Sequence, residues 1–295
     1  MVKAVVSVLG QDQKGVVARF ATYLSERGAN ILDLEQQVAS GRFLMDMLVD
    51  LSEMEMTLDE LIPDLMAQGK AIGMTVKVAL QQPGDLQPKV ALLVTRERHC
   101  LDELIERARH DAYRGRLVCV LGNHPDLQAV AEAAGLPFEW EPSKDRKAEH
   151  FDWLMKRLAH YGADLVVLAR YMQILPPAMV QAYPSRIINI HPSLLPNFPG
   201  PRPYHRAWEA GVRVAGCTAH YVTEDLDEGP IILQDVFGID VGRDTAEDVR
   251  AKGQKLEGRI LAEAVGMHLD QKLVVVDGKV VFRPGLTALL GERSA

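Results

Sequence analysis

The sequence predicts an α/β protein in two parts: a ferredoxin-like βαββαβ unit over residues 1–80, then a doubly wound, mostly parallel sheet over residues 89–295. In the first part, the spacing of apolar residues in successive segments predicts strand, helix, strand, strand, helix and strand. In the second part, strand-like and helix-like segments alternate. Between them, residues 81–88 are polar and contain two prolines and a glycine, which is typical of an interdomain linker.

The strands and helices of residues 1–80 are predicted from the spacing of apolar residues and from the glycines that lie between these segments. Val16, Phe20, Tyr23 and Leu24 keep helical spacing, and Gly28 follows where a helix commonly ends. The predicted strands are 2–9, 31–38, 42–50 and 74–80, and the predicted helices are 16–27 and 57–69.

The elements beyond residue 88 alternate in the way that builds a parallel sheet with helices on both faces. The predicted strands are 89–95, 116–122, 164–169, 186–191, 215–222 and 231–237, and the predicted helices are 99–110, 126–134, 145–161, 177–182, 203–210 and 245–268. A final hairpin turns at Asp277-Gly278. Ligands of such sheets bind beyond the carboxyl ends of the strands, where we expect His191 and the segment 169–175.

The composition argues against several classes of protein. A net charge of −7, without a run of Lys or Arg, argues against a nucleic-acid partner. The N-terminal apolar run is too short for a signal peptide, and no apolar run reaches the length of a membrane span. Cys100, Cys119 and Cys217 are widely scattered and form no CxxC pair, so we expect a cytoplasmic protein. We expect no metal site, because the nine histidines show no HxxxH or HExxH spacing.

The residues whose side chains are best suited to catalysis lie at the end of the predicted strand 186–191. Asn189 and His191 are two residues apart, so on a strand both face the same side. An amide that can donate to an oxyanion therefore lies beside an imidazole that can move a proton. Asp227 lies in an acidic loop that ends at Gly229, and its carboxylate could orient that imidazole. Together these groups predict chemistry on an acyl or formyl carbon.

Three motifs carry a resemblance to a known family. They are Asn189-Ile190-His191-Pro192-Ser193-Leu194-Leu195-Pro196, then Gly216-x-Thr218-x-His220, then Asp227-x-Gly229-x-Ile231-Ile232-x-Gln234. In this order they resemble the folate-dependent formyltransferase superfamily, which implies that Asn189, His191 and Asp227 are catalytic. The implied substrate-binding residues are Tyr171, Met172, Gln173, Ile174, Leu175, Tyr204, His205, His220, Val222 and Thr223.

Some of these residues have a simpler alternative. His220 lies within an apolar strand, so a purely structural role is at least as well supported as a contact with the ligand. His205 follows three prolines, and the alternative for this residue is that it merely begins a helix and does not contact the ligand. Cys100 beside His99 is better explained as a small buried cysteine at a helix start than as a nucleophile.

The N-terminal unit supplies a second resemblance. Asp12-x-x-Gly15 followed by Gly28-Ala29-Asn30-Ile31 is similar to an ACT domain. The resemblance implies that small amino acids such as glycine and methionine bind near Asp12, Gly15, Gly28, Ala29 and Asn30. It also implies a homo-oligomer, at least a dimer, through these domains. The alternative is that the glycines only end elements and that the unit only stiffens the assembly.

The whole layout, an ACT-like domain followed by a formyltransferase-like domain, resembles the formyltetrahydrofolate deformylase family. That resemblance implies hydrolysis of 10-formyltetrahydrofolate to tetrahydrofolate and formate without a cofactor. The reaction would supply formate for purine synthesis and balance the one-carbon folate pool. The segment Val94–Leu101 contains no glycine, whereas glycinamide ribonucleotide formyltransferases carry a Gly-Ser-Asn loop there for the substrate phosphate.

One residue departs from the deformylase pattern. Pro192 follows His191, where deformylases commonly carry a second histidine and transferases carry proline. A formyltransferase that acts on an amine such as glycinamide ribonucleotide is therefore the alternative activity. A folate- or amino-acid-sensing protein without turnover is the alternative from another class.

Overall fold

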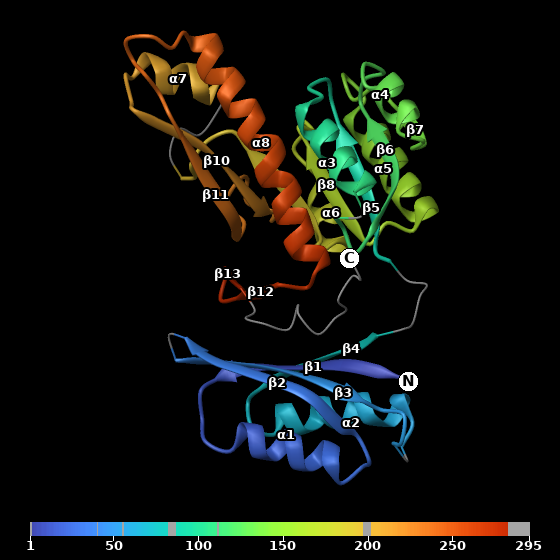
Figure 1. The fold of residues 1–295 in the computed structure, drawn as a ribbon. Helices are drawn as coiled ribbons and strands as arrows, with labels where there is room; N and C mark the ends of the chain where they lie inside the picture. Colours follow the sequence, from blue (N-terminus) through green and yellow to red (C-terminus); the bar gives the residue numbers. More distant parts are fainter. Residues whose placement is uncertain are drawn as a thin grey trace. The chain divides into compact units, whose positions relative to one another are not determined.

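The computed structural model describes residues 2–39, 41–54, 56–81, 87–110, 112–196 and 202–282. Contacts divide the chain into two compact units, one within Met1–Leu86 and the other over Gln87–Phe282 (Figure 1). Residues 82–86 of the predicted linker and residues 283–295 of the predicted second part lie outside the described residues. Each unit is therefore treated by itself.

The first unit is a four-stranded antiparallel sheet with both helices on one face (Figure 1). The strands follow the order β2-β3-β1-β4, which confirms the predicted βαββαβ arrangement. Phe20 and Leu24 of the first helix are buried, as their helical spacing predicts. The elements are β1 (Lys3–Gln11), α1 (Val16–Ser25), β2 (Asn30–Ala39), β3 (Arg42–Asp50), α2 (Leu58–Lys70) and β4 (Thr75–Gln81).

The second unit contains a seven-stranded sheet in the order β11-β10-β9-β8-β5-β6-β7. The strands from β9 to β7 are parallel, and β10 and β11 are antiparallel to their neighbours. The strands are β5 (Lys89–Val94), β6 (Arg116–Gly122), β7 (Phe138–Trp140), β8 (Leu165–Ala169), β9 (Ile187–His191), β10 (Val214–Tyr221) and β11 (Ile231–Gly238). The mostly parallel α/β sheet is confirmed, and β7 was not predicted.

Helices cover both faces of this sheet, and a two-stranded hairpin follows them. The helices are α3 (His99–Arg109), α4 (Gln128–Ala133), α5 (Lys147–Tyr161), α6 (Pro177–Ala182), α7 (Pro203–Glu209) and α8 (Ala246–Leu269), and the hairpin strands are β12 (Leu273–Val276) and β13 (Lys279–Phe282). Among the described residues, no helix is both long enough and apolar enough to cross a membrane.

Alternation along β5 shows how one strand serves two cores. Val90, Leu92 and Val94 belong to the core that includes residues of α3 and α8. Ala91 and Leu93 belong to the other core, which includes residues of α5. Because every residue of Val90–Val94 is fully buried, this strand appears in the sequence as a continuous apolar run rather than as an alternating one.

Two glycines let α8 pack closely on its neighbours. A Cβ on Gly258 would lie 3.0 Å from the carbonyl oxygen of His99 at the start of α3, and one on Gly253 would overlap the ring of Tyr204. At its N-terminus, α8 has a capping box in which Thr245 and Asp248 exchange hydrogen bonds. The close packing brings the middle of α8 against the loop that follows β5.

Candidate active site

A cavity of about 390 Å³ opens at the carboxyl ends of β8 and β9. This is the edge at which doubly wound sheets bind ligands. It is lined by Leu168, Arg170, Tyr171, Met172, Gln173, Ile174, Leu175, Asn189, Ile190, His191, Pro192, Arg202, Pro203, His220, Val222, Thr223, Glu224, Leu226 and Asp227. The three residues that the sequence predicts to be catalytic therefore lie in one cavity.

His191 and Asp227 form a hydrogen-bonded pair within this cavity. His191 Nδ1 lies 3.1 Å from Asp227 Oδ2. The hydrogen bond from His191 holds the pKa of the Asp227 carboxyl below its usual value, against the opposing effect of burial. Nε2 of His191 is buried and has no hydrogen-bond partner among the described residues. The ring therefore has one nitrogen fixed by a carboxylate and the other available to a ligand.

His220 fixes the orientation of Asn189. His220 Nδ1 donates to the carbonyl oxygen of Tyr221 at 2.9 Å, so Nε2 is the acceptor of the neutral ring and takes a hydrogen bond from Asn189 Nδ2 at 3.2 Å. Burial lowers the pKa of His220, which favours this neutral form. The second N–H of the Asn189 amide stays available for a ligand in the cavity.

The second sequence motif supports the loop that follows His191. Thr218 donates to the carbonyl oxygen of Ser193 at 2.8 Å and accepts from the backbone N–H of Leu195 at 3.1 Å. Gln234 donates to both Thr218 Oγ1 and the carbonyl oxygen of Leu195. A Cβ on Gly216 would overlap the carbonyl oxygen of Asp235, so this position requires glycine. These residues therefore hold the backbone beside the cavity and do not line it.

The segment 171–175 forms one wall of the cavity and is anchored at two points. The backbone N–H of Met172 donates to Thr95 Oγ1 at 3.0 Å. The hydroxyl of Tyr171 hydrogen-bonds to Nε2 of the buried His150, whose Nδ1 donates to the carbonyl oxygen of Glu141. Met172 and Ile174 are 61% and 64% exposed and present an apolar surface at the cavity.

Eight of the ten predicted substrate-binding residues line the cavity, and Tyr204 and His205 do not. The ring of Tyr204 is buried against Phe237, and its hydroxyl faces the carboxylate of Glu257. His205 is paired with Glu209 one turn along α7. The residues at the cavity from this region are Arg202 and Pro203, which precede the positions that the sequence suggested.

The predicted effector residues fall into two groups at opposite ends of α1. Asp12 and Gly15 precede the helix, and Gly28, Ala29 and Asn30 follow it. The ten residues of α1 separate the groups by roughly 15 Å at 1.5 Å per residue. Gly15 and Gly28 have φ of 86° and 78°, so both positions favour glycine for backbone reasons alone. One small ligand cannot contact both groups of the same chain.

Comparison with known proteins adds the family to this geometry. The formyl transferase family matches residues 88–265, and the ACT domain family matches residues 3–79. The formyltetrahydrofolate deformylase of Bacillus subtilis (strain 168) is 38% identical over 274 residues, which cover 92% of this chain and 90% of the relative. The chain belongs to the formyltetrahydrofolate deformylase family.

Solved structures separate the deformylases from the transferases. The formyltetrahydrofolate deformylase of Pseudomonas syringae pv. tomato is 33% identical with a TM-score of 0.84, covering 96% of this chain and 94% of that one. The glycinamide ribonucleotide transformylase 1 of Symbiobacterium toebii is 35% identical with a TM-score of 0.64, and the match covers 68% of this chain and 99% of that one. Similarity to the deformylases thus extends over both units.

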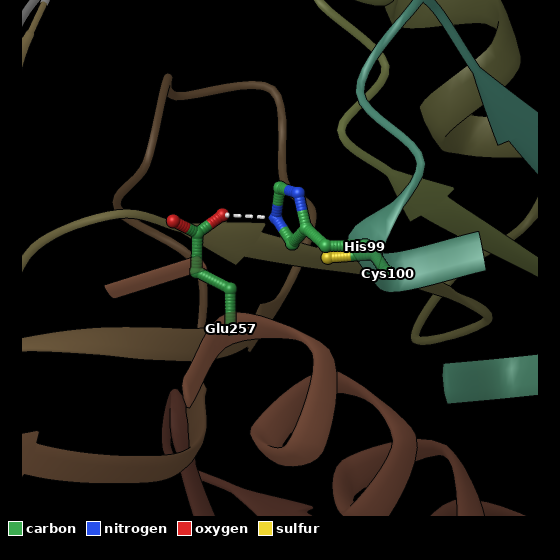
Figure 2. A group of neighbouring side chains, drawn as sticks. All are labelled: His99, Cys100 and Glu257. Atoms are coloured by element: carbon green, nitrogen blue, oxygen red, sulfur yellow. Dashed lines mark hydrogen bonds and ion pairs between the residues drawn. The ribbon is translucent and has the colours of Figure 1, made fainter. Parts of the chain in front are cut away.

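A cluster of charged residues beside the cavity was not predicted from the sequence. Figure 2 shows the ring of His99 directed at the carboxylate of Glu257, with the thiol of Cys100 close by. His99 Nε2 lies 3.1 Å from Glu257 Oε2. Arg170 joins the cluster and also lines the cavity. Glu257 is 1% exposed, and its isolated position in the long helix α8 gives no sign in the sequence that it meets His99 at the start of α3 and Arg170 after β8.

The cluster includes three potential metal ligands, His99, Cys100 and Glu257. Their geometry favours an ion-pair network over a metal site, because Oε2 of Glu257 lies 3.4 Å from the guanidinium Nε of Arg170. A metal cation bound to that oxygen would meet a buried positive charge. Burial also raises the pKa of Cys100 well above its usual value, which disfavours the thiolate that a metal would need.

Proposed function

We propose that the protein hydrolyses 10-formyltetrahydrofolate to tetrahydrofolate and formate in this cavity, with Asn189, His191 and Asp227 as the catalytic residues. The observation that carries the proposal is the convergence of these three side chains at one cavity in a chain of the deformylase family. Formate release would supply purine synthesis and balance the one-carbon folate pool. The proposed location is the cytoplasm.

In the proposed reaction, the oxygen of a water molecule attacks the formyl carbon and forms an oxyanion. The amide N–H of Asn189 that is not bonded to His220 donates to this oxyanion. A preorganised donor of this kind is worth about 3–4 kcal/mol of the barrier in other acyl-transfer enzymes. His220 contributes by keeping the amide nitrogen, rather than the amide oxygen, in place.

Proton transfer is assigned to His191. With Nδ1 held by Asp227, Nε2 takes a proton from the attacking water and returns one to the folate nitrogen as the carbon–nitrogen bond breaks. The Asp227 carboxylate stabilises the imidazolium that forms between the two steps. The sum is one water consumed and one formate and one tetrahydrofolate released, with no oxidation or reduction.

The start of α3 supports hydrolysis over transfer to a phosphate-bearing amine. The loop before α3 lacks glycine and carries Glu97, and Glu257 packs against the first residue of the helix. These carboxylates are paired with Arg170 and Arg250. A phosphate placed there would be repelled by the two carboxylates, and the arginines that could bind it are already paired with them. Pro192 is the one feature that favours the transferase alternative, and measurement of formate release separates the two activities.

The N-terminal unit is proposed to regulate the enzyme. We infer that small amino acids such as glycine and methionine bind between two copies of the chain. The separation of the two residue groups along α1 supports this inference, because a contact between protomers could bring Asp12 and Gly15 of one chain near Gly28, Ala29 and Asn30 of another. The proposed assembly is a homo-oligomer, at least a dimer, through these units.

The test is formate release from 10-formyltetrahydrofolate by the purified protein, measured with and without a chelator and without an amine acceptor. We expect stoichiometric formate and tetrahydrofolate, with the same rate in the chelator. Strict dependence on glycinamide ribonucleotide, with no formate made, would replace this proposal by the transferase alternative. Folate binding without turnover of either kind would favour the sensing alternative.

A further inference from the structure

Arg170 occupies an unusual backbone position at the edge of the cavity. It follows the last residue of β8, precedes Tyr171, and has a φ of 61°. The left-handed region is unfavourable for a residue with a side chain. Such conformations persist where surrounding contacts determine them, and they are concentrated at functional sites.

The contacts that determine it come from two other parts of the fold. The guanidinium Nε lies 2.9 Å from Glu97 Oε2, in the loop after β5, and 3.4 Å from Glu257 Oε2, on α8. The Arg170 side chain is 14% exposed and that of Glu257 is 1% exposed. A buried guanidinium with two carboxylates is held much more firmly than a surface ion pair, because removal of either partner leaves an uncompensated buried charge.

The outer members of the cluster complete its charge balance. Arg250 Nη2 lies 3.2 Å from Glu97 Oε1, and His99 Nε2 donates toward Glu257 when that nitrogen carries a proton. The two carboxylates thus have two guanidinium partners and one imidazole partner. Arg170 is the member that also lines the cavity.

We infer that Arg170 is a positioning residue, held by Glu97 and Glu257, that sets the direction in which residues 171–175 enter the cavity. The inference rests on the proposed function in one respect: it takes that segment to be a wall of the folate site. The turn at Arg170 aims the chain, and the hydrogen bonds of Met172 to Thr95 and of Tyr171 to His150 hold the segment after the turn.

The inference predicts a separation between binding and chemistry. Arg170→Gln and Glu257→Gln should raise the KM for 10-formyltetrahydrofolate by about tenfold or more, the scale of one charge-assisted hydrogen bond. The value of kcat should change by less than about threefold, because His191 and Asp227 lie on other elements. Arg170→Lys keeps the charge and should recover part of the loss.

The backbone and the side chain can be tested separately at this position. Arg170→Gly makes a φ of 61° easy but removes the guanidinium, so the inference predicts that it raises KM as Arg170→Gln does. Arg259→Gln is the matched control, because Arg259 lies on the same helix as Glu257 and pairs with Asp235, outside the cavity lining. This control should leave KM within about twofold of the wild type.

A second variant and a binding measurement test the role of Arg170 even if a single variant folds poorly. Where Glu257→Gln folds poorly, the double variant Arg170→Met/Glu257→Leu replaces the buried pair by apolar groups, which proteins often tolerate. It should fold and still show the raised KM. Calorimetric titration with tetrahydrofolate, the proposed product, gives an affinity that needs no turnover, and it should fall in parallel with the change in KM.

Failure of the inference and failure of the proposed function are then distinguishable. A wild-type protein that binds tetrahydrofolate without hydrolysing the formyl compound ends the proposed function, while the binding series still tests Arg170. Unchanged KM and unchanged tetrahydrofolate affinity in folded Arg170→Gln and Arg170→Met/Glu257→Leu variants would overturn the inference. A wild-type protein that binds no folate would overturn both.

Discussion

The two imidazoles of the cavity hold their protons in different ways. His220 uses Nδ1 as a donor to the Tyr221 carbonyl oxygen, which leaves Nε2 as an acceptor for Asn189. His191 uses Nδ1 toward Asp227, which leaves a buried Nε2 that has no hydrogen-bond partner among the described residues. Burial lowers the pKa of His220 and keeps that ring neutral, whereas Asp227 fixes the orientation of the His191 ring. In the proposed mechanism, His220 therefore orients the oxyanion donor Asn189 while His191 transfers protons.

The His191–Asp227 pair leads to the first prediction. His191→Ala and Asp227→Asn should each lower kcat by at least about 10², the usual scale for general acid–base groups, and should leave KM within a few-fold. Asn189→Ala should do the same through the lost oxyanion contact. Steady-state formate release measures both constants. Near-normal turnover in both the His191 and the Asp227 variants would show that the catalytic assignment is wrong.

His220 allows a graded comparison. His220→Ala removes the acceptor that orients the Asn189 amide but leaves the amide itself, so kcat should fall by about tenfold, less than in Asn189→Ala. The double variant should be no worse than Asn189→Ala alone, because the two residues act on one contact. Fully additive losses in this cycle would mean that His220 acts independently of Asn189.

Some of the residues of the site, but not their partners, could be predicted from the sequence. The two-residue spacing of Asn189 and His191 predicts that they share a side of a strand, and the structure places both at the cavity. The partnership of Asn189 with His220 depends on the antiparallel register of β9 and β10, in which these residues are directly opposite. No local pattern in a single sequence gives that register. The Arg170 cluster was missed for the same reason, since its members come from three separate elements.

The β10–β11 loop determines where Asp227 lies. Asp227 has a φ of 58°, and the loop closes through a hydrogen bond from the Tyr221 N–H to the Pro230 carbonyl oxygen. A Cβ on Gly229 would overlap the carbonyl oxygen of Tyr221. That atom belongs to the backbone of a buried strand, so it cannot move aside as a flexible side chain can.

Gly229→Ala should therefore disturb the loop that carries Asp227. We expect a loss of about 1–3 kcal/mol in the free energy of unfolding and a fall in kcat of at least about tenfold, because the His191–Asp227 distance changes. Gly238→Ala is the matched control, because a Cβ on Gly238 of β11 would meet no atom within 4 Å and its φ lies outside the left-handed region. Urea unfolding and formate release measure both effects. Equal behaviour of the two variants would refute the close-contact argument.

The elements themselves were mostly predictable, with an instructive exception. Continuous apolar runs gave the strands β5 and β8, because parallel strands covered on both faces are buried along their whole length. The strand β7 has three residues, Phe138–Trp140, which are too few to show a period. It forms because β6 offers a parallel edge to pair with, and this is a tertiary cause.

Across the whole molecule, each unit has its own hydrophobic core. The residues that line the cavity all belong to the second unit, so the regulation that we propose for the first unit would not depend on residues that it supplies to the cavity. The change in periodicity on either side of residues 81–88 predicts a boundary between domains there. The split of the effector residues between the ends of α1 was predictable as well, because the predicted helix 16–27 already separates them.

The proposed regulation is tested on the intact chain. Glycine and methionine should change the rate of formate release, and Asp12→Ala and Asn30→Ala should weaken that response while leaving the rate without amino acid unchanged. A chain truncated before residue 87 should lose both the response and the oligomeric state measured by light scattering. Indifference of the intact enzyme to both amino acids, together with an unchanged oligomeric state after truncation, would contradict the proposal and leave the catalytic site unaffected.

Buried histidines predict how the stability of the second unit depends on pH. Burial lowers the pKa of His150, His220 and His268, that of His268 to about 4. In the unfolded chain these rings titrate near 6.5, so between about pH 6.5 and 4 the unfolded state binds protons that the folded state does not. The free energy of unfolding should therefore fall as the pH drops through this range.

Tryptophan fluorescence can follow this unit alone, because Trp140, Trp153 and Trp208 all belong to it. The urea midpoint should be lower at pH 5 than at pH 7.5, and His268→Gln should make the difference between the two midpoints smaller. A midpoint that is the same at both pH values would contradict the burial of neutral histidines.

The central claim is that water attacks the formyl carbon in the cavity that holds Asn189, His191 and Asp227. The most direct test is mass spectrometry of the products formed from ¹³C-formyl-labelled substrate in H₂¹⁸O, with glycinamide ribonucleotide also present. The account predicts that the labelled carbon appears in formate carrying one ¹⁸O, and that Asn189→Ala, His191→Ala and Asp227→Asn each slow its formation by at least about 10². Recovery of the labelled carbon in formylglycinamide ribonucleotide, with little formate, would contradict it.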